Sequence, residues 1–475
     1  MKRLFLLLAV VGMLFTACSD SKSAKPTSPS DNEIWYTTTD DKPLVLSNRN
    51  LSQFNVKDKD GNKSRGVNVS FISNTYSNGR GVLKFSKWAV SDFIKCGIFR
   101  NQSTLESVIL PNSLECIEAD AFYGCSSLTS INIPNNIENI RHGAFSKCSS
   151  LTSINIPESV TKIGGGAFRG CSSLTNINIP ESVTEIENYA FNGCSSLTSI
   201  NIPNNVTKIG CEAFKGCSSL TSINIPNSVT FIGYSAFEGC SSLTSINISN
   251  SATTIGYEAF EGCTSLTNIN IPDSVTTIGY SAFYGCSSLT SITIGNSVTD
   301  ISDQAFYGCS SLTSINIPES VTWIGDYAFN DCSNLININI PESVKKIENY
   351  AFNGCSSLTS INIPKSVTNI GEYAFNGCSS LTSINLPENE TLRIGAFAFK
   401  GCSSLTSIII PENVIAEEHA FRGCSLTSIT FLDLRPYLFF HRLGIPSTTT
   451  IYVPKEAVEA YMNASVNREQ IKPIE

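Results

Sequence analysis

Cysteine is the residue type in this chain whose number and spacing point most directly to chemistry. The 475 residues include 18 cysteines, and most recur every 23 residues, as at Cys125, Cys148 and Cys171. Zinc sites place their cysteines about two to four residues apart and often add histidine. Disulfides are typical of exported chains, but a position that repeats at a fixed interval stacks on its own copies. We therefore favour reduced, buried thiols that pack as small apolar side chains, with paired disulfides as the alternative.

Other residues that could support catalysis are not grouped into a recognisable motif. His142, His419 and His441 lie far apart in the sequence, and none stands beside a nucleophile or a metal-ligand motif. The glycines lack the spacing and the lysine of a phosphate-binding loop. Acidic residues such as Glu158 and Glu181 follow a proline and read as solvated turn positions. The sequence thus predicts no catalytic site, no metal and no cofactor.

A row of amide side chains is the best candidate for binding. Each copy of the repeat carries a polar residue between two isoleucines, which is an outward position if the segment is a strand. Such a row either stabilises the stack through amide ladders or also contacts a ligand, and both readings stay open. Tyrosines near Tyr234 and Tyr350 offer an alternative adhesive face. The row consists of Asn132, Asn155, Asn178, Asn201, Asn224, Asn247, Asn270, Thr293, Asn316, Asn339, Asn362 and Asn385.

The elements that must position these residues form a repeat of 23 residues. Ala-Phe pairs recur without a slip from Phe122 to Phe375. Within one copy, the alternation of Asn176 to Ile179 predicts a short strand. The apolar residues from Val183 to Phe191 are spaced as in a helical or 3₁₀ turn. One copy buries too few apolar side chains to fold alone, so the copies must stack as a solenoid.

The overall composition is poor in charge. Charged residues make up 15% of the chain, and the formal net charge is −8. A nucleic-acid-binding protein needs a basic stripe to neutralise phosphates, and none is present. We therefore predict no nucleic-acid partner.

The N-terminus has the features of an export signal. Lys2 and Arg3 precede an apolar run too short to span a bilayer permanently. The run ends at Ala17 and Cys18, which resembles a bacterial lipoprotein cleavage box. We predict a signal peptide over residues 1–17, a lipidated Cys18 and a flexible tether over 18–31. An ordinary cleaved secretion signal is the alternative.

The flanks of the repeat differ from it in pattern. Asn78 and Gly79 lie between two strand-like runs and predict a hairpin. We interpret residues 32–98 as an N-terminal cap with a β-hairpin, 99–430 as the repeat array and 431–475 as a C-terminal cap. An independent small binding domain is the alternative for the N-terminal segment.

The unit LTSINIPxSVTxIGxxAFxGCSS resembles the leucine-rich repeat of the BspA-like family of bacterial surface proteins, from about Phe99 to Ser428. The resemblance implies a leucine-rich repeat solenoid, with short parallel strands on its concave face, short turns opposite and a cap at each end. It also implies surface display, here through a lipid anchor at the outer membrane or cell surface of a Gram-negative bacterium. We expect a non-catalytic adhesin or scaffold for a host extracellular-matrix or other cell-surface protein. Glycan capture and a structural, self-associating role are the alternatives.

Overall fold

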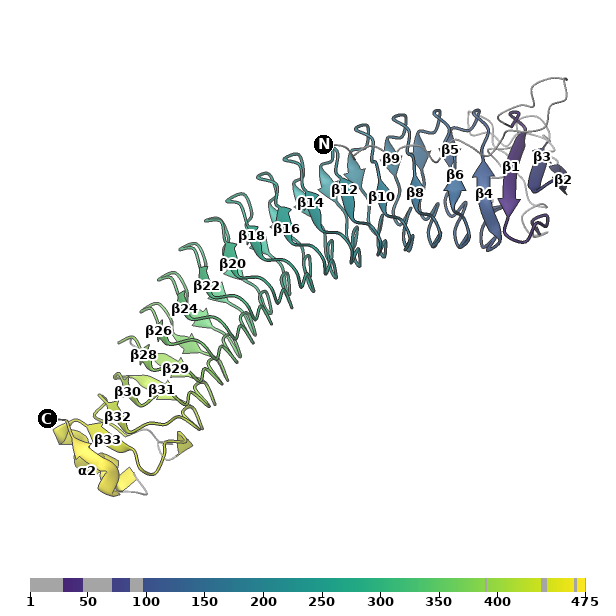
Figure 1. Ribbon diagram of the computed structural model, residues 1–475. Coiled ribbons are helices and arrows are strands. Elements are labelled where there is room, and N and C mark those ends of the chain that lie inside the picture. Colours follow the sequence, from purple (N-terminus) through teal and green to yellow (C-terminus); the bar gives the residue numbers. More distant parts are fainter. Residues whose placement is uncertain are drawn as a thin grey trace, which may run out of the picture.

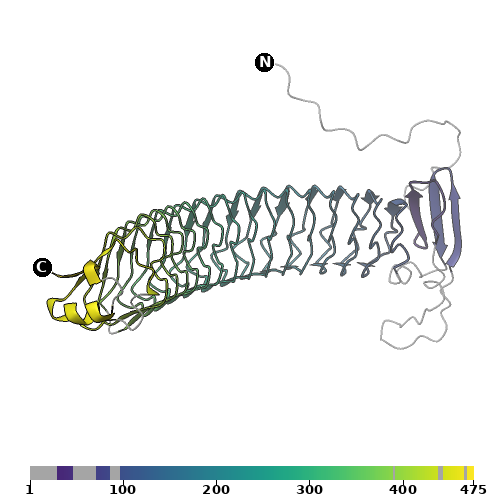
Figure 2. The same cartoon turned by 90° about the horizontal axis from the view of Figure 1, so that it is seen from below.

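The chain forms one continuous stack of coils that bends into an arc (Figure 1). The computed structural model describes residues 29–45, 71–85, 97–388, 391–436, 442–464 and 468–474. Figure 2 shows the same stack from below, with its coils following one another at regular intervals. The solenoid that the 23-residue repeat predicts is therefore confirmed.

The first strand of most coils carries the Ser-Ile-Asn sequence or a close variant of it and pairs in parallel with its copies. In β12, Ser199, Ile200 and Asn201 stand opposite the same three residue types of β14. The isoleucine points inward and its two neighbours point to solvent, as the alternation predicts. These first strands are β4 (Leu105–Ile109), β6 (Ser130–Ile131), β8 (Ser153–Ile154), β10 (Asn176–Ile177), β12 (Ser199–Asn201), β14 (Ser222–Asn224), β16 (Ser245–Asn247), β18 (Asn268–Asn270), β20 (Ser291–Thr293), β22 (Ser314–Asn316), β24 (Asn337–Asn339), β26 (Ser360–Asn362), β28 (Ser383–Asn385), β30 (Ser407–Ile410) and β32 (Ser428–Phe431).

A second short strand follows in each coil and builds a 14-stranded parallel sheet. Between the two strands the chain turns at the proline, where the Val183 amide donates to the Pro180 carbonyl. The second strands are β5 (Cys116–Ile117), β7 (Asn139–Ile140), β9 (Lys162–Ile163), β11 (Glu185–Ile186), β13 (Lys208–Ile209), β15 (Phe231–Ile232), β17 (Thr254–Ile255), β19 (Thr277–Ile278), β21 (Asp300–Ile301), β23 (Trp323–Ile324), β25 (Lys346–Ile347), β27 (Asn369–Ile370), β29 (Leu392–Ile394) and β31 (Val414–Ala416).

The helical turn predicted from Val183 to Phe191 does not form. Residues 97–388 and 391–436 contain no helix, and the predicted segment is divided between β11 and a run of turns. Tyr189 has a φ of 62°, which a right-handed helix excludes. The Phe191 amide donates to the carbonyl of Ala213 in the next coil, at 2.8 Å. Hydrogen bonds between coils therefore replace those that a helix would make within one coil.

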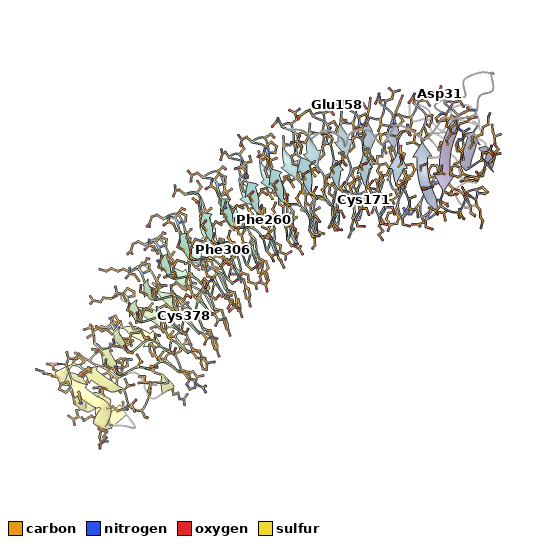
Figure 3. The ribbon with its side chains drawn as sticks, viewed as in Figure 1. Asp31, Glu158, Cys171, Phe260, Phe306 and Cys378 are labelled. Atoms are coloured by element: carbon orange, nitrogen blue, oxygen red, sulfur yellow. The ribbon has the colours of Figure 1, made fainter. Side chains whose placement is uncertain are left out.

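The core is a column of phenylalanine rings, one from each Ala-Phe pair. Neighbouring rings from Phe99 to Phe421 lie 5.1 to 5.6 Å apart and are at most 12° from parallel. Figure 3 labels Phe260 and Phe306 inside the stack, and both are fully buried. Each ring covers the next, so the stability of a coil depends on its neighbours.

The N-terminal strands pair with the first coil. β2 (Phe71–Ser77) and β3 (Arg80–Phe85) are antiparallel around a turn at Asn78 and Gly79, both with positive φ. β1 (Glu33–Thr38) lies antiparallel to both β3 and β4. This pairing occupies one edge of β4, and the capping role remains a prediction.

The C-terminal segment continues the sheet with two more strands and places its helices between them. β33 (Thr450–Val453) pairs in parallel with β32 and with β34 (Ile471–Pro473). Between β33 and β34 lie η2 (Lys455–Ala457), α2 (Val458–Ala464) and η3 (Arg468–Gln470). The described residues contain no helix long and apolar enough to cross a membrane. The predicted signal peptide and Cys18 lie outside the described residues.

Candidate interaction surfaces

The twelve polar residues predicted to form a row do so, and all are exposed to solvent. Nine of them lie on the first strands, and Asn132, Asn155 and Asn178 directly follow such a strand. Asn201, Asn224 and Asn247 are register partners. Asn270 is likewise paired with Thr293. Because neighbouring parallel strands are about 4.8 Å apart, the side chains repeat at this interval along the stack. We call this surface the asparagine row.

Amide ladders within the asparagine row are rare. Among its twelve members, one amide–amide hydrogen bond forms, from Asn385 Nδ2 to Asn362 Oδ1 at 3.0 Å. Asn132 instead binds the backbone of Leu110 through both its oxygen and its nitrogen. Most amides in the row therefore keep their hydrogen-bonding capacity for solvent or for a ligand.

A threonine row next to the asparagine row has a structural role. The hydroxyl of Thr221 donates to the carbonyl of Thr198, and Thr244 donates to Thr221 in the same way, at 3.3 and 3.1 Å. These bonds link successive coils and satisfy the side chains. The side-chain hydrogen bonds between coils that the sequence suggested for the asparagine row are therefore made largely by threonine.

The cysteines at the 23-residue interval are reduced and buried, as predicted. Fourteen of the described cysteines are buried and none is in a disulfide. Each of these thiols donates to a carbonyl of an earlier coil, as Cys171 Sγ does to Phe145 O at 3.1 Å. Figure 3 labels Cys171 and Cys378 within the stack. Cys116 and Cys211 are partly exposed, and Cys96 lies outside the described residues.

Tyrosines on the Ala-Phe turns form two columns that differ in exposure. Tyr234, Tyr257 and Tyr280 stand three residues before the phenylalanine and are exposed. Tyr327 and Tyr350 stand two residues before it and are half-buried, with rings stacked 4.6 Å apart. Stacked rings present their edges, not their faces, to solvent. This arrangement disfavours sugar binding on the half-buried column.

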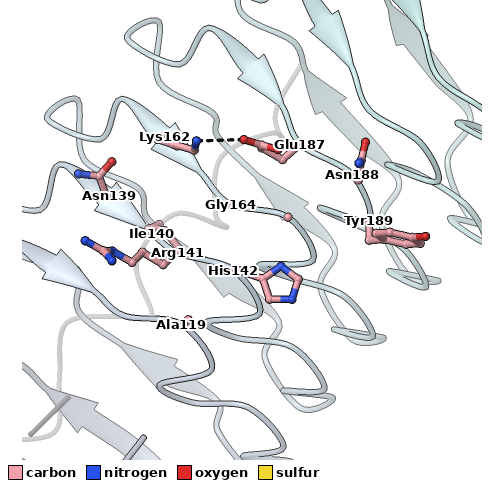
Figure 4. A pocket seen from close by; sticks show the side chains of 11 residues that line it. Ala119, Asn139, Ile140, Arg141, His142, Lys162, Gly164, Glu187, Asn188 and Tyr189 are labelled. Carbon is pink, nitrogen blue, oxygen red and sulfur yellow. Dashed lines mark ion pairs between the residues drawn. The ribbon is translucent and has the colours of Figure 1, made fainter. Parts of the chain in front are cut away.

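A hollow of about 670 Å³ lies over the second strands β7 and β9, and Figure 4 shows it from close by. Its cations are already paired: Lys162 lies 3.2 Å from Glu187, and Arg141 lies 3.3 Å from Glu118. The hollow therefore offers little net charge to an anion. Its lining consists of Ala119, Asn139, Ile140, Arg141, His142, Lys162, Gly164, Gly165, Glu187, Asn188 and Tyr189.

Sequence reasoning missed this hollow, although a signal is visible. Residues 164–166 are three consecutive glycines where other copies carry two or three side chains. A Cβ atom at Gly165 would lie 3.3 Å from His142 Nδ1 and 3.1 Å from the Asn188 carbonyl. Removal of side chains from one coil thus opens a notch between its neighbours.

The two described histidines lie far apart, one near each end of the array. His142 borders the hollow, whereas His419 packs against Phe397 with a centroid distance of 5.1 Å and an interplanar angle of 36°. His441 lies outside the described residues. Within the described part of the chain, no group of three or more His, Cys, Asp or Glu side chains could hold a metal ion.

Comparison with known proteins identifies the repeat. A family model, the BspA type leucine rich repeat region (6 copies), matches residues 92–221, 207–336 and 322–441. A leucine-rich repeat protein from Bacteroides ovatus ATCC 8483 is 35% identical, with a TM-score of 0.55 over 66% of this chain and 88% of that one. A leucine rich cell surface protein from Faecalibacterium prausnitzii A2-165 is 33% identical, with a TM-score of 0.39 over 61% and 81% of the two chains. No curated protein matches the chain.

Proposed function

Because the chain belongs to the family built from the BspA type leucine-rich repeat region, we propose that it is a non-catalytic scaffold displayed at a bacterial surface. In this proposal, a lipid on Cys18 anchors it to the outer membrane or cell surface of a Gram-negative bacterium. The solenoid binds a host extracellular-matrix protein or another cell-surface protein. Leucine-rich repeat proteins generally mediate contacts between proteins, which supports this assignment.

The observation that carries the proposal is the asparagine row. Twelve exposed, uncharged side chains stand at a regular interval on a rigid stack, and most make no amide–amide bond with one another. A surface of equal, weak sites gains strength by avidity when a partner contacts several of them at once. Such a surface has the properties of an extended binding face and offers no group that would catalyse a reaction.

Lysine substitutions on the row test the binding role. The variant Asn201→Lys, Asn224→Lys, Asn247→Lys places three long cations on neighbouring strands, and we expect it to bind immobilised matrix proteins or whole cells at least about fivefold more weakly. The matched control is Thr207→Lys, Thr230→Lys, Thr253→Lys, since these exposed threonines lie in the same coils next to the second strands. Equal losses in both variants would exclude the asparagine row as the binding face.

Two further measurements test the rest of the proposal. Metabolic labelling with a fatty acid should label the wild-type chain and not Cys18→Ser, and the variant should leave the membrane fraction. A glycan array separates the protein partner from glycan capture: strong glycan binding that the three asparagine substitutions abolish would favour the glycan. Absence of binding to every protein, cell and glycan would favour a structural role.

A further inference from the structure

The charge of the solenoid is distributed unevenly along its length. Between Lys215 and Lys345 the chain contains no lysine, arginine or histidine, but it contains ten carboxylates. All of this segment is described, and it forms the middle of the arc. The carboxylates are Glu238, Glu258, Glu261, Asp273, Asp300, Asp303, Glu319, Asp326, Asp331 and Glu342.

Three of these carboxylates lie on the Ala-Phe turns that carry the exposed tyrosines. Glu238 and Glu261 directly follow the Ala-Phe pair in successive coils, and Glu258 precedes one of these pairs. Partial burial, followed by the charges of Glu238 and Glu258, raises the pKa of Glu261. Like charges are therefore held close together, with Lys215 as a cation at one end, 2.6 Å from Glu238.

The tyrosines beside these carboxylates are unusually open to solvent. Tyr234, Tyr257 and Tyr280 are 50%, 52% and 38% exposed, and they are the tyrosines among the exposed large apolar side chains of the described residues. Tyr234 and Tyr257 stack with centroids 5.0 Å apart. We call Tyr234, Tyr257, Tyr280, Glu238, Glu258 and Glu261 the acidic tyrosine patch.

Outside the middle of the array, the protein covers similar aromatic rings with its own cations. Arg100 lies over the Tyr123 ring at 4.5 Å, and Arg169 lies over Tyr189 at 5.4 Å. Lys400 lies 5.6 Å from the Tyr373 centroid at the other end. Arg169 and Lys400 directly follow an Ala-Phe pair, as Glu238 and Glu261 do in the patch, and Arg100 follows Phe99 at the same place in the repeat. The covered rings stand at other positions of the turn than the patch tyrosines: Tyr189 and Tyr373 come two residues before the phenylalanine, and Tyr123 comes directly after one. The chain's own cations thus contact aromatic rings of these turns towards both ends of the array, whereas its middle contains no lysine or arginine.

We propose that the acidic tyrosine patch binds a segment of a partner protein rich in lysine and arginine. Stacking occupies one face of Tyr234 and one face of Tyr257, so guanidinium and ammonium groups would lie against the outer faces of these two rings and against Tyr280. They would also neutralise the carboxylates of the patch. The inference rests on the proposed function only in that it assumes a displayed binding scaffold. It adds the chemistry of the partner and a face separate from the asparagine row.

A charged peptide tests this inference with the full-length chain. The probe is a short fluorescein-labelled peptide of alternating lysine, arginine and glycine, and its control has every lysine and arginine replaced by glutamine. We expect the basic peptide to bind, the neutral peptide not to bind, and affinity to fall as salt increases. Failure of the wild-type chain to bind the basic peptide at low salt would overturn the inference.

Matched variants separate the patch from general electrostatic attraction. Glu238→Gln with Glu261→Gln should weaken peptide binding about fivefold, and Tyr257→Ala about threefold. Glu319→Gln with Glu342→Gln makes the same change in net charge at exposed turns after the strand proline and should weaken it less than about twofold. Equal losses in the two double variants would show attraction to net charge alone and refute the patch. Thermal unfolding monitored by circular dichroism verifies that each variant is folded.

The experiment also keeps this inference apart from the proposed function. The triple Asn→Lys variant should retain peptide binding within about twofold, since its substitutions lie on the first strands. If the chain binds cells or matrix proteins but not the peptide, the patch is refuted and the scaffold role stands. If it binds the peptide but no cell or protein, the acidic tyrosine patch stands and the proposed scaffold role is refuted.

Discussion

The buried thiols predict that this solenoid is sensitive to alkali. Burial raises the pKa of Cys171, Cys217 and Cys263 to about 12, and it raises the pKa of Cys240 and Cys286 in the same direction. In the unfolded chain a thiol has a pKa of about 8.5. Between these values the folded protein keeps its thiol protons while the unfolded chain releases them.

The sign of the effect follows from proton linkage. Where the unfolded state binds fewer protons than the native state, the free energy of unfolding falls as the pH rises. Each buried thiol then contributes a loss of about 1.4 kcal/mol per pH unit above pH ~8.5. The stabilisation is complete below that pH and is lost progressively towards the pKa of the folded state.

The number of thiols makes the loss large. Burial raises the pKa of thirteen of the buried thiols, and each of these costs roughly 2 kcal/mol at pH ~10. The total is on the order of 20 to 30 kcal/mol, which exceeds the stability of about 5 to 15 kcal/mol that is typical of folded domains. We therefore expect the array to unfold between pH ~9 and ~10.5, well before the folded thiols would ionise.

Chemical denaturation at a series of pH values measures this loss, with circular dichroism reporting the fold. A variant with Cys217→Ala, Cys240→Ala, Cys263→Ala and Cys286→Ala should reduce the slope of stability against pH by about 5 kcal/mol per unit above pH ~9. The control Leu220→Ala removes a buried side chain of the same coil that cannot titrate. It should lower stability at every pH and leave the slope unchanged.

Thiolate absorbance gives the decisive result. If the thiolate signal developed near pH ~8.5 while circular dichroism stayed native, the thiols would titrate in the folded state. The burial argument would then be wrong. An unchanged slope in the four-cysteine variant would refute it equally.

Two core substitutions test the stacking and the inward orientation. Phe237→Ala removes a fully buried ring that stacks at 5.4 Å on each side. Chemical denaturation should show a loss of roughly 3 to 5 kcal/mol in the free energy of unfolding. Hydrogen exchange should also increase in the adjoining coils. The control Phe231→Ala deletes the same atoms from a partly exposed site in the same coil and should lower the free energy of unfolding by about 1 kcal/mol. Similar losses in the two variants would contradict the stacked core. Ile200→Asp introduces a charge at a site only 7% exposed and should cost several kcal/mol, about 3 or more. Its neighbour Asn201→Asp places the same group in solvent, and an equally large loss there would reverse the assigned faces of β12.

The repeat sequence alone predicted the stack, the inward isoleucines and the burial of the cysteines. A fixed interval of 23 residues places each side chain on its own copy in the next coil, whatever path the coil follows between them. Asn178, Asn201 and Cys194 could therefore be assigned to rows and columns without coordinates. The hairpin at Asn78 and Gly79 was also visible, because a two-residue turn with positive φ has a distinctive local signature.

Only the tertiary structure decided the conformation and exposure of the Ala-Phe turns. The apolar spacing from Val183 to Phe191 fits a helix, but the amides of Tyr189 and Phe191 bond to carbonyls of the next coil and Tyr189 takes a positive φ. No local pattern reports such bonds between coils. The same turns expose Tyr257 and half-bury Tyr350, although the two stand one position apart in the repeat. That difference depends on how each turn packs on its neighbours, and it determines which aromatic rings a partner can reach.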